Sequence, residues 1–167
     1  MRPDPPELAS LSLAALSPGT RASIVRLCTA ALASDCSSLF GFLSDSTHVL
    51  ATLDGRLIGH ACWTTRRLVP ADLPPLRTAW VDAVVVDPAH QNVSVGTCVM
   101  RRVAELTADY DLRALGTEQA AFFARLGWER WHGPTAGVLH DPLDSLMILG
   151  TETFPRLDTG MPISGAD

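Results

Sequence analysis

The sequence contains no lysine, and all 13 of its basic residues are arginine. That absence excludes Schiff-base chemistry, a P-loop lysine and a lysine general base. The cysteines stand far apart without any C-x-x-C pair, so the patterns of a zinc site and of a redox dithiol are missing as well. We therefore expect no bound metal, and four buried, reduced thiols in a cytoplasmic protein.

A long apolar run is also missing from the start of the chain, MRPDPPELAS, and we expect neither a signal peptide nor a membrane anchor. The formal net charge of −5 disfavours nucleic acid as a partner and is compatible with a cationic ligand. A mild negative charge that serves only solubility is the plainer explanation of the same number.

What is present fits one globular domain. The chain has 167 residues, of which 47% are hydrophobic and 19% are charged, and this balance supports a single core. We expect one domain over residues 1–167, with a loose, Pro-rich start at 1–7 and a C-terminal tail at 155–167.

The apolar pattern predicts an α/β protein with a mixed sheet. Asp54-Gly55 is the dipeptide most typical of a tight hairpin turn, here between two strands within 47–68. A proline-rich link at 69–75 leads to a Val-rich central strand that ends at Pro88. The remaining elements are strands at 7–13, 112–117, 128–139 and 144–153, and helices at 17–35, 95–110 and 118–127, the last closed by Gly127.

Residues 84–103, VVVDPAHQNVSVGTCVMRRV, read as a strand, a polar turn and a helix. A helix N-terminus offers unpaired N–H groups and a positive dipole end, which together bind anions such as phosphate. The first helical turn has no acid that would repel an anion. No G-x-G-x-x-G or Walker pattern is present, so dinucleotide and nucleoside triphosphate sites are poorly supported. From the residues alone, a phosphate-binding turn and a plain strand, loop and helix both remain open.

Two motifs resemble those of the GNAT acetyltransferase superfamily. VVVDPAHQNVSVGTCVM resembles its acetyl-CoA motif, Q/R-x-x-G-x-G/A after a strand ending in V-x-P, and here runs from Gln91 to Gly96 with Ser94 in place of the inner glycine. Downstream, AAFFARLGW resembles the F-Y-x-x-x-G-F signature, with Phe123 where tyrosine is common. The resemblance implies a GNAT-like fold with a splayed central strand and an acetyl-CoA cleft.

A narrower resemblance spans roughly residues 20–160. LRTAWVDAVVV, GWERWHGPTAGVL and RLDT look like segments of the actinobacterial aminoglycoside 2′-N-acetyltransferases, and W-H-G-P-T is the most specific match. Asp35, in ALASDCSS, stands where those relatives carry a substrate-binding aspartate, although it could equally cap a helix. Ala83 replaces a glycine of that family.

The resemblance also implies the roles of individual residues. Asp82 and Val84 are the expected catalytic residues, with the Asp82 carboxylate near the amine and the strand's backbone N–H groups facing the thioester; a plain buried strand and an exposed aspartate are the alternatives. Phe123 would lie beside the cofactor. The residues expected to bind acetyl-CoA are Val84, Val85, Val86, Gln91, Asn92, Val93, Ser94, Val95, Gly96, Thr97 and Phe123, and those expected to bind substrate are Asp35, Asp82, Ala83 and Asp144, with Asp141 competing for the last position.

The general acid of the family is missing, because phenylalanine at 123 cannot protonate a thiolate and the only tyrosine, Tyr110, ends a different helix. The implied activity is acetyl-CoA-dependent acetylation of the 2′-amine of an aminoglycoside, either kasugamycin or a 2-deoxystreptamine compound, which confers resistance. The alternatives are a GNAT for another small amine or a peptide N-terminus, and a catalytically idle protein that binds acetyl-CoA or drug. The expected partner is a cationic amino sugar, and a homodimer follows only by analogy.

Overall fold

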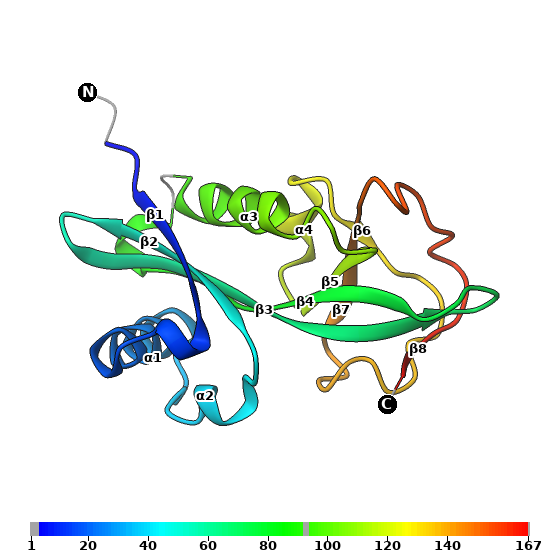
Figure 1. The fold of residues 1–167 in the computed structure, drawn as a ribbon, viewed down its shortest axis with the longest axis horizontal. Coiled ribbons are helices and arrows are strands. Elements are labelled where there is room, and N and C mark those ends of the chain that lie inside the picture. Colours follow the sequence, from blue (N-terminus) through cyan, green and yellow to red (C-terminus); the bar gives the residue numbers. More distant parts are fainter. Residues whose placement is uncertain (1–3, 92–93, 167) are drawn as a thin grey trace. The chain divides into compact units, whose positions relative to one another are not determined.

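The computed structural model describes residues 4–91 and 94–166, which form two compact units (Figure 1). Unit 1 comprises Met1–Thr64 and Asp82–Leu106, and unit 2 comprises Thr65–Val81 and Thr107–Asp167. Two long strands, β3 (Arg56–Pro70) and β4 (Leu76–Val86), contribute residues to both units. The expectation of a single domain stays a prediction.

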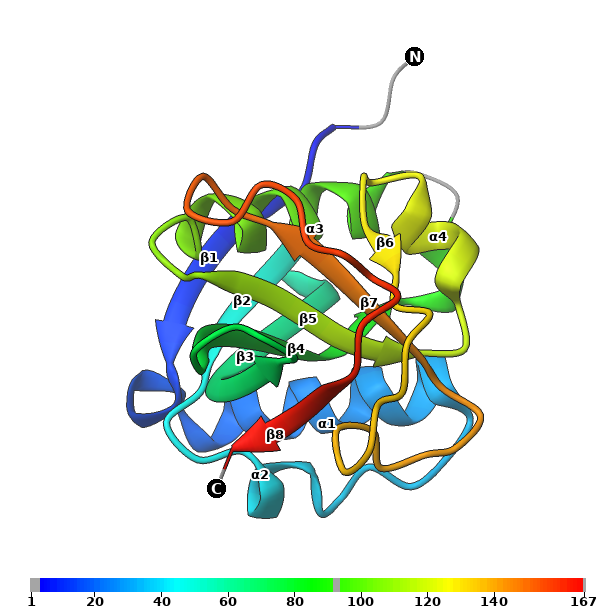
Figure 2. The ribbon, with the colours of Figure 1, turned by 90° about the vertical axis from the view of Figure 1, so that its right-hand side faces the viewer.

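Unit 1 is built on an antiparallel sheet in which β1 pairs with β2 and β2 pairs with the first half of β3. Asp54 and Gly55 join β2 to β3 and both have left-handed backbones, with φ of 50° and 74°, so the predicted two-residue hairpin turn is confirmed. Helix α1 covers one face of this sheet and α3 covers the other (Figures 1 and 2). The elements are β1 (Glu7–Ser12), η1 (Leu13–Ala15), α1 (Pro18–Leu32), α2 (Leu39–Phe42), β2 (Thr47–Leu53), η2 (Pro88–His90) and α3 (Val95–Leu106).

Local sequence explains where α1 begins and which face it buries. The Ser17 side chain accepts a hydrogen bond from the Thr20 backbone N–H at 3.1 Å, and Pro18 occupies the first helical turn, where a missing N–H costs nothing. The buried residues of α1 are Ile24, Leu27 and Cys28. They form one apolar cluster with Leu16, Leu50 and Val85. The helix predicted at 17–35 is therefore confirmed, although it ends at Leu32.

Helix α3 approaches β3 closely at Gly59. A Cβ atom at this position would lie 2.7 Å from Val95 Cγ1 and 3.3 Å from Val99 Cγ2, so only a residue without a side chain allows the contact. The helix ends at Leu106, four residues before the predicted end at 110, because the chain turns there: the Tyr110 N–H donates to the Thr107 carbonyl at 3.1 Å.

Unit 2 contains both parallel and antiparallel strand pairs. β5 runs parallel to β4 and antiparallel to β7, β6 is antiparallel to β7, and β8 is antiparallel to the end of β3. Its buried core contains Leu68, Leu76, Trp80, Leu112, Ala114, Trp131, Val138, Leu146, Ile148 and Ile163. The elements are β5 (Leu112–Thr117), α4 (Ala120–Ala124), β6 (Glu129–Arg130), β7 (Ser145–Gly150) and β8 (Ile163–Ala166).

The strand predicted at 128–139 is wrong except for β6. The W-H-G-P stretch instead holds the C-terminal segment: Trp131 Nε1 donates to the Met161 carbonyl at 2.9 Å, and the N–H groups of His132 and Gly133 donate to the Thr159 carbonyl. That segment then forms β8, a strand that the sequence did not predict and that pairs with the end of β3. Because β3 continues to Pro70, the link predicted at 69–75 begins only after this residue.

Three smaller expectations need correction or confirmation. Helix α4 is shorter than the predicted 118–127, although Gly127 does follow it with a left-handed φ of 90°. All four cysteines are free, as expected, but Cys36 and Cys98 are only partly buried.

Within 4–91 and 94–166, no helix is both long and apolar enough to cross a membrane.

We predict that Gly59→Ala destabilises the protein by about 1–3 kcal/mol, because the added Cβ overpacks the contact with Val95. Urea denaturation measures the change. Gly41→Ala is the matched control, since a Cβ at Gly41 meets no atom within 4 Å and its stability should be unchanged or higher. Equal stabilities of the two variants would contradict the close contact.

Candidate active site

Strand β4 runs through Ala83, but its backbone is irregular there. This residue has a φ of 50°, in the left-handed region that costs an L-residue roughly 1–2 kcal/mol. Side chains alternate regularly only along a strand with regular extended backbone, so alternation does not place the expected catalytic residues Asp82 and Val84 on one face here. Val85 is buried in the apolar cluster under α1, whereas Asp82, Val84 and the following Val86 are half-buried.

Side chains of β3 hold the backbone carbonyls of Asp82 and Ala83. His60 Nδ1 donates to the Ala83 carbonyl at 2.8 Å, and the Cys62 thiol donates to the Asp82 carbonyl at 3.5 Å. The local backbone of β4 therefore depends on polar groups that come from the neighbouring strand.

Sequence reasoning missed these side chains. A register shift between Ala51 and Thr52 in β2 places His48 opposite Cys62 and Leu50 opposite His60. Cross-strand partners lie on the same face of a sheet, so the shift brings His48, His60 and Cys62 together. The His48 and His60 rings are joined by a hydrogen bond of 2.9 Å between His48 Nδ1 and His60 Nε2, and Ser46 Oγ lies 2.8 Å from His48 Nε2.

Burial keeps this cluster uncharged. Desolvation lowers the pKa of His60 to about 3, against a weaker opposing effect of its hydrogen bond to the Ala83 carbonyl. Desolvation, and then the charge of Arg21, lower the pKa of His48 to about 4. Burial raises the pKa of the Cys62 thiol far above its usual range, with a further contribution from Asp82. Both imidazoles and the thiol are therefore neutral at neutral pH.

The same cluster could offer ligands to a metal ion, since one donor atom each of His48, His60 and Cys62 lies within 4.8 Å of the others. An ion at the centre would have to break the hydrogen bond between the two imidazoles and draw a proton from a thiol whose pKa is raised. The side chains fit a hydrogen-bonded cluster better than a metal site. The expectation of no metal stays a prediction.

The turn from β4 to α3 is anchored at Asp87. Its carboxylate accepts from the Ala89 N–H at 2.9 Å and pairs with Arg56 at 2.8 Å, and its own N–H donates to the Ile58 carbonyl. The hydrogen bond from the Ala89 N–H, and then the charge of Arg56, lower the pKa of Asp87. Gln91 is exposed and its side chain lies 3.5 Å from the Val86 carbonyl oxygen. Asn92 and Val93 lie outside the described residues.

Ser94 leads directly into α3 and has a left-handed φ of 65°. Its carbonyl accepts the Cys98 N–H at 3.0 Å, which is the first hydrogen bond of the helix. The N–H groups of Val95, Gly96 and Thr97 belong to the first helical turn, where no backbone carbonyl of the helix can receive them. No acidic residue stands in that turn. The arrangement suits an anion such as a pyrophosphate.

Ala83 and Ser94 stand where the resembled motifs carry glycine, and both have left-handed backbones. Glycine adopts this conformation without a steric penalty, whereas residues with side chains adopt it less readily.

The two aspartates expected to bind substrate have different surroundings. Asp35 is exposed in the turn after α1, and the N–H of Ser37, which donates to its carboxylate at 2.9 Å, lowers its pKa. This hydrogen bond closes a turn between the helices, since the C-cap of α1 is Ala33 and the N-cap of α2 is Ser38, and the substrate-binding role of Asp35 stays a prediction. Its neighbour Cys36 and Ala83 both pack against the same apolar cluster. Asp144 belongs to unit 2, where burial, and then the charges of Asp141 and Glu118, raise its pKa.

Neither aromatic candidate offers a proton. Phe123 is buried in unit 2 and packs edge-on against Trp128, with ring centroids 5.9 Å apart. Tyr110 is also buried, and its hydroxyl is hydrogen-bonded to Thr65 Oγ1 at 2.8 Å while Arg77 lies over its ring. The expectation that the family's general acid is missing stays a prediction.

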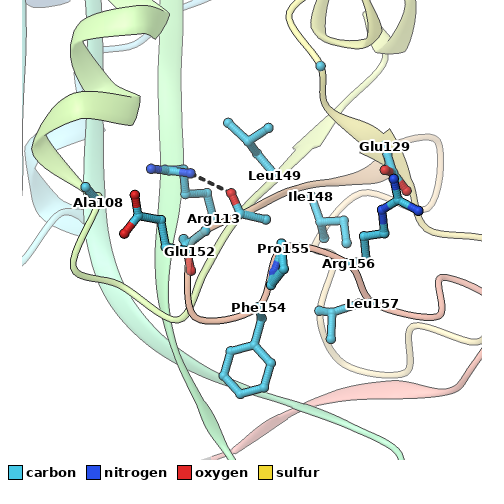
Figure 3. Close-up of a pocket in the computed structure, with 13 residues that line it drawn as sticks. Ala108, Arg113, Glu129, Ile148, Leu149, Glu152, Phe154, Pro155, Arg156 and Leu157 are labelled. Atoms are coloured by element: carbon cyan, nitrogen blue, oxygen red, sulfur yellow. Dashed lines mark hydrogen bonds between the residues drawn. The ribbon is translucent and has the colours of Figure 1, made fainter.

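A separate pocket of about 460 Å³ lies in unit 2 (Figure 3). Arg113 extends into it, but its guanidinium donates to the Gly150 carbonyl at 2.7 Å and to Thr107 Oγ1 at 2.8 Å, and so supports the pocket wall. Arg156, Glu129 and Glu152 also line the pocket, so both charge signs are present. Of the expected site residues that the structure describes, none lines it.

A family model described as the acetyltransferase (GNAT) family matches residues 24–128, more than half of the chain. The fold is similar to that of the Escherichia coli GNAT family N-acetyltransferase YhbS in complex with CoA, with a TM-score of 0.70 and 13% identity over 99% of this chain and 93% of that chain. An acyl-CoA N-acyltransferase from Pseudomonas aeruginosa has a TM-score of 0.65 and 15% identity over 86% of this chain and 98% of that chain. A GNAT family acetyltransferase from Brucella melitensis in complex with acetyl-CoA has a TM-score of 0.62 and 17% identity, over 92% and 93%. No curated protein matches the chain.

We predict that the free energy of unfolding falls as the pH is lowered from 7 to 5. The unfolded chain takes up protons on its histidines near pH 6.5, whereas His48 and His60 in the folded protein do so only near pH 4 and 3. The stability that they contribute is therefore present above pH 6.5 and is lost as the pH falls, by about 2 kcal/mol per histidine over this range.

Urea midpoints at pH 7, 6 and 5 measure the effect. His60→Gln should flatten the dependence, because the glutamine side chain takes up no proton in this range. An equal pH dependence in the wild type and His60→Gln would contradict the assignment.

Proposed function

Because the chain belongs to the acetyltransferase (GNAT) family, we propose that it transfers the acetyl group of acetyl-CoA to the 2′-amino group of an aminoglycoside. The observation that carries the cofactor half of the proposal is the pair of left-handed residues Ala83, in β4, and Ser94, before α3. Ser94 leads into a first helical turn whose N–H groups have no carbonyl partner within the helix. Two proteins of similar fold are named as complexes with CoA and acetyl-CoA.

In the proposed reaction, the amine nitrogen attacks the thioester carbonyl carbon, the C–S bond breaks, and the products are an amide and CoA. Negative charge develops on the carbonyl oxygen, where the N–H groups of Val84, Val85 and Val86 would stabilise it. The pyrophosphate would lie on the N–H groups between Gln91 and Thr97, including those of Asn92 and Val93.

The nitrogen loses two protons in this reaction, one as the ammonium becomes the attacking amine and one as the amide forms. The half-buried Asp82 is the proposed acceptor of the first, acting through a water, and solvent takes the second. The departing thiolate gains one proton from water, because Phe123 has no proton to give and the Tyr110 hydroxyl is bonded to Thr65, so that one proton is released overall. A missing general acid typically costs about 10²–10⁴-fold in rate, so we expect slow turnover.

The substrate half of the proposal rests on the resemblance and on carboxylates. Asp35 is exposed and its pKa is lowered, so its carboxylate is ionised at neutral pH. Asp144 lies near the negative charges of Asp141 and Glu118, and a cationic amino sugar would offset their repulsion. Acetylation would convert an ammonium into a neutral amide and so remove a charge that binds ribosomal phosphates, which is a route to resistance. Kasugamycin and the 2-deoxystreptamine compounds remain alternative substrates.

The first test is thiol release from acetyl-CoA with a panel of amines. The panel contains aminoglycosides with a 2′-amine, one with a 2′-hydroxyl, kasugamycin and an unrelated polyamine. We expect release with the 2′-amines and none with the 2′-hydroxyl analogue, since only an amine yields the amide. Release with the polyamine alone would indicate a different amine substrate, and acetyl-CoA binding without any release would indicate the idle binding protein.

A second test addresses the pyrophosphate site. Thr97→Asp places a carboxylate in the first turn of α3, where it would repel a pyrophosphate, and we expect the KM for acetyl-CoA to rise about tenfold or more. The matched control is Thr20→Asp, which adds the same charge to the first turn of α1. If both variants kept the wild-type KM, the pyrophosphate would not bind at α3.

A further inference from the structure

A chain of buried polar side chains ends at the proposed thioester site. It runs from Ser46 through His48 and His60 to the Ala83 carbonyl, with contacts of 2.8, 2.9 and 2.8 Å. Ser46, His48 and His60 are each no more than 1% exposed. Three polar side chains at such depth cost free energy unless each is satisfied, so their contacts are specific.

The carbonyl at the end of this chain fixes the direction of every hydrogen bond. A carbonyl oxygen only accepts, so His60 Nδ1 must carry the proton that it donates to Ala83. Neutral His60 then accepts at Nε2 from His48 Nδ1–H, and His48 accepts at Nε2 from the Ser46 hydroxyl. One pair of tautomers satisfies all three contacts.

The groups that face the chain leave it neutral. Arg21 contributes positive charge near His48, and Phe40 lies beside the His48 ring with centroids 5.8 Å apart. On the other side, Cys62 is a protonated thiol that donates to the Asp82 carbonyl. Protonation of either imidazole would reverse one of the acceptors and break the chain.

The chain terminates where β4 is least regular. A left-handed alanine inside a strand persists only when its surroundings determine the backbone, and the donors from His60 and Cys62 fasten the two consecutive carbonyls there. The next N–H group along β4 is that of Val84, the first of the proposed oxyanion donors. Rotation of the Ala83 carbonyl would turn this N–H as well, because both belong to one planar peptide unit.

We propose that His60, held by His48 and Ser46, is a positioning residue for acetyl transfer: it fixes the Ala83–Val84 peptide so that the Val84 N–H points at the thioester oxygen. This inference rests on the proposed function. The chain transfers no proton to the reactants, because its terminal carbonyl cannot take one up.

The test compares His60→Asn with His60→Gln. The amide of asparagine stands close to the place of imidazole Nδ1 and keeps a donor for Ala83, whereas that of glutamine stands near Nε2 and loses it. With an amine that the wild type acetylates, His60→Gln should lower kcat about 10–100-fold with the KM for acetyl-CoA nearly unchanged, and His60→Asn should retain most of kcat. A purely structural role would damage both variants, and asparagine more, because it leaves the larger void.

Nuclear magnetic resonance supplies a readout that needs no acceptor amine. The difference between the acetyl-CoA and CoA spectra should be largest at the amides of Val84, Val85 and Val86 in the wild type and His60→Asn, and smaller in His60→Gln. Identical differences in all three proteins would overturn the inference and leave the proposed function standing. Failure of the wild type to bind either compound would overturn the proposed function, and this inference with it. Loss of activity on treatment with EDTA would also overturn the inference, by showing that the histidines hold a metal.

Discussion

The left-handed backbone at Ala83 is the constraint on which the candidate active site depends. It breaks the regular course of β4 just before the three valines whose N–H groups are the proposed oxyanion donors. A conformation that alanine disfavours does not persist by itself, and here the polar side chains of His60 and Cys62 hold it from the adjacent strand. The chemistry would then depend on side chains that never touch a substrate.

Two adjacent residues of β3 serve opposite faces of the same sheet. Gly59 faces α3 and, by lacking a side chain, allows Val95 to seat the first turn of the helix close to the strand. His60 points to the other face, opposite Leu50, and holds the Ala83 carbonyl. A single short stretch of β3 thus sets both the proposed pyrophosphate turn and the proposed thioester segment. Alternation of side chains along a strand makes this division possible.

The parts of the fold with local causes were predictable from the sequence. Asp54-Gly55 specified its turn, and Ser17 with Pro18 specified the start of α1, because neighbouring residues alone determine these features. The histidine cluster was not predictable: in a hairpin without the shift between Ala51 and Thr52, the two histidines would lie on opposite faces. Likewise, the strand predicted at 128–139 could not be corrected from local residues, because backbone groups of His132, Gly133 and Pro134 bond to the C-terminal segment, which lies far away in sequence. The roles of the individual site residues rest on the resemblance and stay predictions.

The alanine at 83 also has an evolutionary consequence. Glycine would adopt this backbone without support, whereas alanine requires the donors of His60 and Cys62 to be in place already. Glycine at 83 would tolerate the loss of the histidine or of the thiol, whereas alanine would not, so we expect the residues at 60, 62 and 83 to change together among related chains.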